Sequence, residues 1–236
     1  MKTEKINALL YAGAAFVIYI LLELVYAQVL SQVSLRLIIR ALVTVLLFSW
    51  LQLRYKDVSQ KKNLELSRLI YFIIFGFILT FAGQGIAYWI LNTFEHTNTY
   101  LSLTGLDLII YVLISTSLGA WAEELVFRWG MYHQLRKEFS VLFAFVLSTI
   151  FFILIHGTLM HIPVTLAVSI LSCLIYELTG QFKFCVYTHC IFNLCSLILD
   201  LIIPKLPSIP ILFISLYILA LVGELYIYFS KKTKKF

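Results

Sequence analysis

Eight long apolar runs constrain the fold of this chain more than any other feature of its sequence. A helix that crosses a membrane needs about 20 mostly apolar residues. Runs of that kind cover approximately residues 7–30, 36–53, 69–92, 107–134, 140–157, 162–179, 183–203 and 208–230. Only 13% of the residues are charged, and a soluble domain would need far more polar residues to cover its surface. The sequence therefore predicts an all-α, polytopic membrane bundle of about eight transmembrane helices, forming one domain over residues 1–236.

The charged residues between these runs predict how the bundle is oriented. Lysine and arginine gather on one set of connections, at Lys2, Lys5, Arg54, Lys56, Lys61, Lys62, Arg68, Arg136, Lys137, Lys183 and in the KKTKKF ending. The alternate connections carry only Lys205. Because lysine and arginine collect on the cytoplasmic side of a membrane, both termini are predicted to be cytoplasmic. The first run is too long for the core of a signal peptide, so we interpret it as the first span.

Ionisable side chains inside the apolar runs are the second unusual feature, because each costs about 2.5–3.5 kcal/mol on membrane-insertion scales. Those that occur usually face the bundle interior and pair with one another. They are Glu23, Arg40, Asp107, Glu123, Glu124, Arg128, His133, His156, Glu177, His189 and Asp200, together with the amide of Asn193. The fourth run holds the most of them, so we expect a polar site to be built around it.

The segment EELVFR, residues 123–128, contains two adjacent carboxylates and an arginine. Glu124 and Arg128 are four residues apart, so on an α-helix they share a face and can form an ion pair. Glu123 points about 100° away from Glu124 and has no partner on its own helix. An unpaired carboxylate in a bundle of low dielectric suits a general base. The alternative is that all three charges only hold the bundle together.

Two further runs each carry a short polar pattern. In FFILIH, Phe152 lies four residues before His156 and can pack against its imidazole; in YTHCIFN, His189 and Asn193 share a face. The histidine offers a base, a metal ligand or a donor, and the amide offers a donor for an oxyanion. Each pattern alone is equally typical of core residues that satisfy one another. A rise of 1.5 Å per residue allows Glu123 and these residues to meet in one cavity, if the helix of His189 starts slightly earlier.

Together, these three patterns resemble the CAAX protease and bacteriocin-processing family of intramembrane proteases. The order is Glu123-Glu124-x-x-x-Arg128, Phe152-x-x-x-His156 and His189-x-x-x-Asn193, on three separate apolar helices. Each motif is weak alone, and the three in this order are much more specific. The resemblance covers a catalytic core at about residues 107–200, while the remaining spans carry no diagnostic motif.

The resemblance implies an intramembrane endopeptidase in which Glu123 and His156 activate a water molecule. His189 and Asn193 would hold the scissile carbonyl and stabilise the oxyanion, and Glu124, Arg128 and Phe152 would shape the site. The family is often described as metalloproteases. A single zinc held by Glu123, His156 and His189 plus water and a directly activated water without metal both remain open.

The expected partners are the lipid bilayer and a membrane-embedded or membrane-tethered peptide or protein substrate, with no nucleic acid. Bacterial relatives are linked to bacteriocin self-immunity and peptide maturation, and the Ile/Leu/Lys/Phe/Tyr-rich composition favours a multi-pass protein of a bacterial plasma membrane. The alternative is a non-catalytic immunity or scaffold protein that binds a bacteriocin or another partner. A proton-coupled transporter is disfavoured, since neither internal repeats nor interrupted helices are evident.

Overall fold

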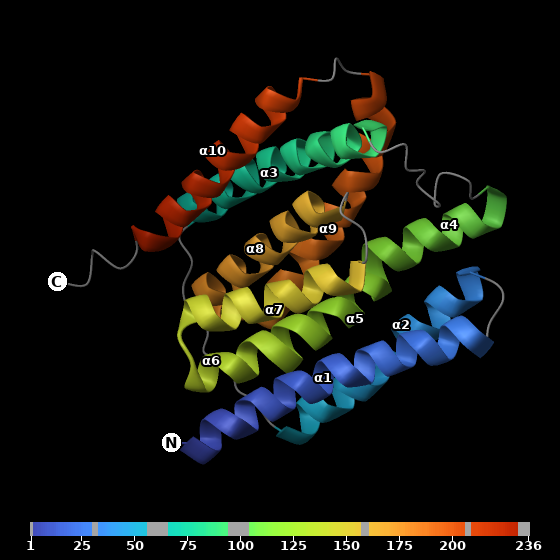
Figure 1. The fold of residues 1–236 in the computed structure, drawn as a ribbon, viewed down its shortest axis with the longest axis vertical. Coiled ribbons are helices and arrows are strands. Elements are labelled where there is room, and N and C mark those ends of the chain that lie inside the picture. Colours follow the sequence, from blue (N-terminus) through green and yellow to red (C-terminus); the bar gives the residue numbers. More distant parts are fainter. Residues whose placement is uncertain are drawn as a thin grey trace.

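A computed structural model describes residues 2–29, 33–55, 66–93, 104–156, 161–205 and 209–230, which form a helical bundle without a strand among them (Figure 1). The helices are α1 (Lys2–Val29), α2 (Val33–Tyr55), α3 (Leu66–Thr93), α4 (Gly105–Ile114), η2 (Ser115–Gly119), α5 (Ala120–Glu124), η3 (Leu125–His133), α6 (Gln134–Glu138), α7 (Val141–His156), α8 (Ile162–Thr179), α9 (Phe182–Ile202), η5 (Ile203–Lys205) and α10 (Pro210–Phe229).

The predicted fold class is confirmed. In the described part of the chain, 7 helices are long and apolar enough to cross a membrane, and α7 is a shorter apolar helix of 16 residues. These eight elements match the eight apolar runs, so the chain is an integral, multi-pass membrane protein. The predicted orientation depends on charges of which many, in 56–65 and in 231–236, lie outside the described residues.

The fourth span departs from a plain α-helix. Residues 105–138 form one continuous helical rod, but η2 and η3 within it are π-helical. Bonds from residue i to i+5 are rare, and π-helical turns within α-helices occur frequently at functional sites. The two segments flank Ala120–Glu124, which carries both adjacent glutamates. The unusual backbone is therefore concentrated where the ionisable residues are.

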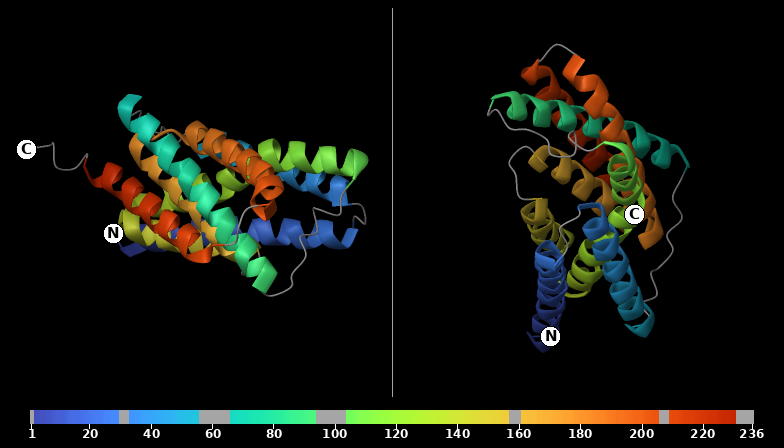
Figure 2. Two further views of the ribbon diagram at one scale, coloured as in Figure 1. Left: turned by 90° about the horizontal axis from the view of Figure 1, so that it is seen from above. Right: turned by 90° about the vertical axis from the view of Figure 1, so that its right-hand side faces the viewer.

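The bundle buries α8 at its centre and exposes apolar side chains around its outside. In α8, 72% of the membrane window is buried, more than in any other described span. α3 and α10 form one flank, α1 and α2 form the opposite flank, and α4–α8 lie between them (Figure 1 and Figure 2). Large apolar side chains such as Leu10, Leu46 and Ile211 face outward. The side chains on the outside of the bundle are thus largely apolar, as contact with the hydrocarbon of a bilayer requires.

Helices α3 and α10 approach each other closely because glycine lies at their contact. A Cβ atom added at Gly85 would overlap the ring of Phe213, and one added at Gly223 would lie within 2.5 Å of the ring of Phe75. Glycine therefore lets the aromatic side chains of one helix lie directly against the backbone of the other. Small residues allow membrane helices to pack in this way.

We expect Gly85→Ala to destabilise the protein by about 1–3 kcal/mol, because the added methyl group overpacks the contact with Phe213. The matched control is Gly13→Ala, since an added Cβ at Gly13 meets nothing within 4 Å. Alanine is about 1 kcal/mol better than glycine within a helix, so the control should be unchanged or more stable. The measurement is the thermal unfolding midpoint of each variant in detergent. Equal midpoints would contradict the close α3–α10 contact.

Candidate active site

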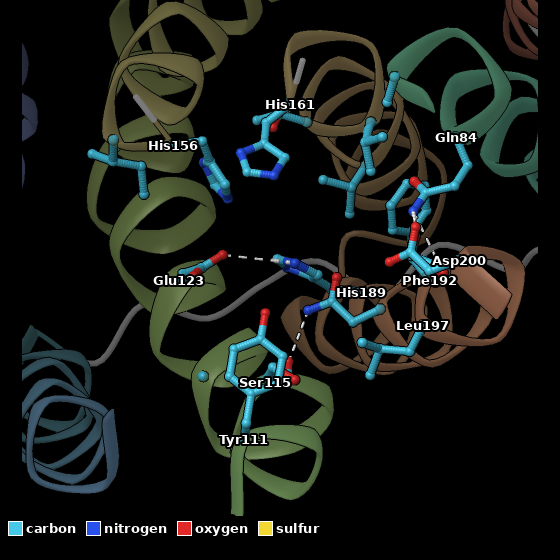
Figure 3. Close-up of a pocket in the computed structure, with 18 of the residues that line it drawn as sticks. Gln84, Tyr111, Ser115, Glu123, His156, His161, His189, Phe192, Leu197 and Asp200 are labelled. Carbon is cyan, nitrogen blue, oxygen red and sulfur yellow. Dashed lines mark hydrogen bonds and ion pairs between the residues drawn. The ribbon is translucent and has the colours of Figure 1, made fainter. Parts of the chain in front are cut away.

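One cavity of about 720 Å³ collects the polar residues that the sequence singles out. Its wall includes Glu123 from α5, His156 from the end of α7, and His189 and Asn193 from α9. Figure 3 shows Glu123, His156 and His189 on three different helices, turned toward a common space. The structure therefore brings all four predicted site residues to one place.

His189 lies between the two adjacent glutamates. Its Nδ1 atom is 2.8 Å from Oε1 of Glu124, and its Nε2 atom is 3.7 Å from Oε2 of Glu123. The imidazole is 2% exposed, whereas the side chain of Glu123 is 16% exposed and lines the cavity. Two neighbouring carboxylates thus hold opposite edges of one ring, although they point in different directions from their helix.

Glu124 is the buried anchor of this arrangement. Its carboxylate accepts a hydrogen bond from Ser172 Oγ at 3.2 Å, and its Oε2 atom is 3.3 Å from Nε of Arg128. An arginine stays protonated in proteins, and an ionised carboxylate can only accept hydrogen bonds. The proton on His189 must therefore be at Nδ1, where it is donated to Glu124. This leaves the Nε2 atom of His189 to face Glu123 and the cavity.

The aromatic ring of Phe152 packs against three of these groups. The guanidinium carbon of Arg128 lies 5.0 Å from the ring centroid, within the range of a cation–π contact. The imidazoles of His156 and His189 meet the same ring at centroid distances of 4.8 Å and 5.9 Å. Phe152 is completely buried. It therefore fixes both imidazoles relative to the Glu124–Arg128 pair.

His156 is oriented by its own helix. Its Nδ1–H donates to the carbonyl oxygen of Phe152 at 2.8 Å, since a carbonyl oxygen can only accept. In the neutral ring this leaves Nε2 as a hydrogen-bond acceptor, on the edge that Figure 3 shows turned toward Glu123. His156 and His189 are thus oriented in the same way: Nδ1 is bound by the protein, and Nε2 is directed into the cavity.

The amide of Asn193 is held from the fourth span. Its Nδ2 donates to the carbonyl oxygen of Ser115 at 2.8 Å. Ser115 is the first residue of the π-helical segment η2. Asn193 therefore does not pair with His189, one helical turn before it on α9, and its amide group is fixed at the cavity wall by a different helix.

Several cavity residues were not assigned to the site from sequence. His161, directly before α8, lies beside His156 in Figure 3, and Gln84 donates to Asp200 across α3 and α9. Burial lowers the pKa of the His161 imidazole, and the nearby His156 lowers it further.

Arg40, which also lines the cavity, pairs with Glu23 at 2.6 Å. The sequence signal for Arg40, Glu23 and Asp200 was their position inside apolar runs, but no spacing identified their partners.

The predicted zinc ligands do not form a metal-binding group in this arrangement. Among the described residues, no three histidine, cysteine, aspartate or glutamate side chains lie close enough together to hold a metal ion. Glu123 and His189 are neighbours, and His156 is a second imidazole that is oriented separately, by the carbonyl oxygen of Phe152. The chemistry that we consider below therefore uses only water and the side chains of this chain.

The fold and the cavity define a multi-pass helical membrane protein with a buried site of carboxylate, imidazole and amide groups. Residues 105–195 match the family described as "Type II CAAX prenyl endopeptidase Rce1-like". A Bacillus subtilis protein named "Putative membrane peptidase YdiL" is 26% identical over 149 residues, which cover 61% of this chain and 60% of that relative. No solved structure shows a significant match. The two matches confirm the resemblance to the CAAX protease and bacteriocin-processing family.

We expect Arg128→Met to destabilise the protein by about 3–5 kcal/mol, because it leaves the buried carboxylate of Glu124 without its cation. The control is Lys137→Met at an exposed position of α6, which should change stability by no more than about 0.5 kcal/mol. Thermal unfolding in detergent measures both. The double variant Glu124→Gln/Arg128→Met should recover part of the loss, since it removes both charges. If Arg128→Met is as stable as Lys137→Met, the buried pair does not hold the site.

Proposed function

We propose that the chain is an intramembrane endopeptidase, which hydrolyses a peptide bond in a membrane-associated peptide or protein. One observation carries the proposal: the carboxylate of Glu123 and the Nε2 edges of His156 and His189 face one cavity, while both Nδ1 atoms are bound by the protein. A carboxylate and an imidazole that share a cavity can activate water. The matches to a peptidase family and to a membrane peptidase support the same activity.

In the proposed reaction, Glu123 and His156 activate the water. The water oxygen attacks the carbonyl carbon of the scissile bond as one of its protons passes to the carboxylate of Glu123, with His156 Nε2 accepting a hydrogen bond from the same water. The carbonyl oxygen becomes an oxyanion in the tetrahedral intermediate. When the C–N bond breaks, the proton moves from Glu123 to the departing amine nitrogen. One water is thus added across the peptide bond, and the site returns to its starting state.

The proposed oxyanion site is formed by His189 and Asn193. When protonated at both nitrogens, His189 donates through Nε2, because Nδ1–H is already bonded to Glu124. The Asn193 amide carries a second N–H besides the one given to Ser115. Donors that are fixed before the reaction stabilise developing charge most effectively, because they need no reorganisation. Glu124, Arg128 and Phe152 act in this scheme by holding the two imidazoles in place.

We expect Glu123→Gln to reduce peptide hydrolysis by at least about 10²–10⁴-fold, because the amide keeps the shape of the side chain but cannot accept the proton. Peptide termini from membranes of cells that carry the wild type or the variant, compared by mass spectrometry, identify the dependent cleavages. The matched control is Glu224→Gln, which changes another buried carboxyl group that does not line the cavity. If biological function survives in both Glu123→Gln and His156→Ala, the protein acts as a non-catalytic immunity or scaffold protein.

We expect Asn193→Ala to lower kcat by about 10²–10³-fold, the loss typical of one oxyanion donor, with a much smaller change in KM. The assay uses purified protein in proteoliposomes and a peptide that contains a cleavage site identified in the comparison above. Asn193→Asp keeps the size of the side chain, removes the donor and adds charge, so it should be at least as impaired. A large rise in KM at unchanged kcat would instead assign Asn193 to substrate binding.

A further inference from the structure

The position of the cavity along the bundle carries an inference about the substrate. We infer that the site takes its substrate from the outer side of the membrane, and hence that the substrate is an exported peptide or the outward-facing segment of a membrane-anchored protein. The inference rests on the proposed hydrolytic function of this cavity. It is carried by three observations: the direction of each helix, the distribution of cationic residues, and the half of the bundle in which the cavity lies.

Each described span begins at one end of the bundle and finishes at the other. The start of α1, the short helix α6 and the end of α10 lie at the same end (Figure 1). The end of α2, the start of α3 and the α8–α9 turn at Gly180 lie at that end too, since successive spans alternate in direction. The end of α1, the start of α2, the end of α7 and the start of α8 lie at the opposite end.

The cationic residues identify the first end as cytoplasmic. Among the described residues, Lys5, Arg136 and Lys183 belong to it. The opposite connections contain neither lysine nor arginine at 30–32, 94–104 and 157–161, and the last one is preceded by Lys205. Short loops rich in lysine and arginine remain on the cytoplasmic side. The opposite end is therefore the outer side.

The cavity lies mainly in the outer half of the bundle, and it reaches past the middle only at His189, in the first half of α9. On α2 it is lined by Arg40, seven residues from the outer end, and on α3 by Gln84 and residues that follow it. On α7 it is lined only by the last two residues, of which His156 is one. His161 lies at the outer start of α8, and Asp200 lies near the outer end of α9. Glu123, near the middle of the fourth span, is among the deepest groups that it reaches.

A packed layer closes the cavity toward the cytoplasmic end. A second cavity of about 430 Å³ lies in the inner half, between α1, α2, η3 and α6, and it shares no lining residue with the first. Every residue from Leu125 to Tyr132 is buried, and Ser172, Cys173 and Cys185 on α8 and α9 are buried beside them. Further toward the cytoplasmic end, Glu177 accepts hydrogen bonds from Tyr132 at 2.8 Å and from Arg136 at 2.7 Å. Close-packed interiors leave no path for a polypeptide. A substrate that approaches from the cytoplasm would have to open this layer.

The outer part of the cavity has the polar lining that a peptide needs. Arg40, Tyr111, Gln84 and Asp200 line it, and Figure 3 shows Tyr111 on a different side from Gln84 and Asp200. Polar and charged side chains at membrane depth are costly unless they pair or face water. They also offer donors and acceptors to the backbone of an incoming chain, which cannot satisfy its own hydrogen bonds while it is extended. A segment that already lies outside the membrane can enter here without crossing the bilayer.

The test is the reaction of single cysteines with a charged, membrane-impermeant maleimide on intact cells. Cys190 and Cys195, the partly exposed native cysteines, are first replaced by alanine to give the parent protein. Ala87→Cys then places a thiol in the cavity wall, and Ser140→Cys places one at the exposed α6–α7 turn. We expect Ala87→Cys to react equally before and after permeabilisation, and Ser140→Cys to react only after it.

Labelling of Ala87→Cys only after permeabilisation, or not at all, would overturn the inference, and so would labelling of Ser140→Cys in intact cells. If Ala87→Cys fails to fold, Leu197→Cys probes the same cavity from α9. Each labelling experiment is repeated in the Glu123→Gln background, because it needs no catalytic activity. If the cavity is labelled from outside but function survives Glu123→Gln, the proposed hydrolysis is wrong. If the protein is an active protease but the cavity is labelled only from inside, only the outer-side substrate is wrong.

Discussion

A buried guanidinium–carboxylate–imidazole network is the interaction on which the candidate site depends. Arg128 and Glu124 are both completely buried, and neither charge could be placed there without the other. Glu124 uses its other oxygen to fix Nδ1 of His189. A structural ion pair thereby determines which nitrogen of the imidazole faces the cavity. In the proposed mechanism the two adjacent glutamates therefore have different tasks, because Glu124 orients the histidine and Glu123 faces the cavity.

The same principle extends to the second imidazole through a different acceptor. His156 gives its Nδ1–H to the backbone carbonyl of Phe152, and the side chain of Phe152 packs against both histidines and Arg128. A carbonyl oxygen adds no charge to the apolar interior, so this orientation costs less than a second buried ion pair. In the proposed mechanism, groups that are held before the substrate arrives need little reorganisation during the reaction. In this proposal, Glu124, Arg128 and Phe152 position the imidazoles and do not themselves act on the substrate.

The sequence predicts the helices well because hydropathy is a local property, and α2, α8 and α9 agree with the apolar runs to within a few residues. It also predicts the Glu124–Arg128 pair and the Phe152–His156 contact, since both follow from i,i+4 spacing. It does not predict that Glu124 binds His189, that Asn193 binds Ser115, or that Gln84 binds Asp200. Those contacts join different spans and depend on helix tilt and rotation, which packing determines. No periodic pattern of apolar residues in the sequence predicts the π-helical segments either.

The two halves of the fourth span have different surroundings. Its outer half borders the cavity at positions from Tyr111 to Glu123, whereas every residue from Leu125 to Tyr132 is buried. The change falls between Glu123 and Glu124, and a π-helical segment begins on each side of this short α-helix. Successive residues of an α-helix point about 100° apart. The neighbouring glutamates of α5 therefore have different surroundings, because Glu123 lines the cavity and Glu124 is completely buried.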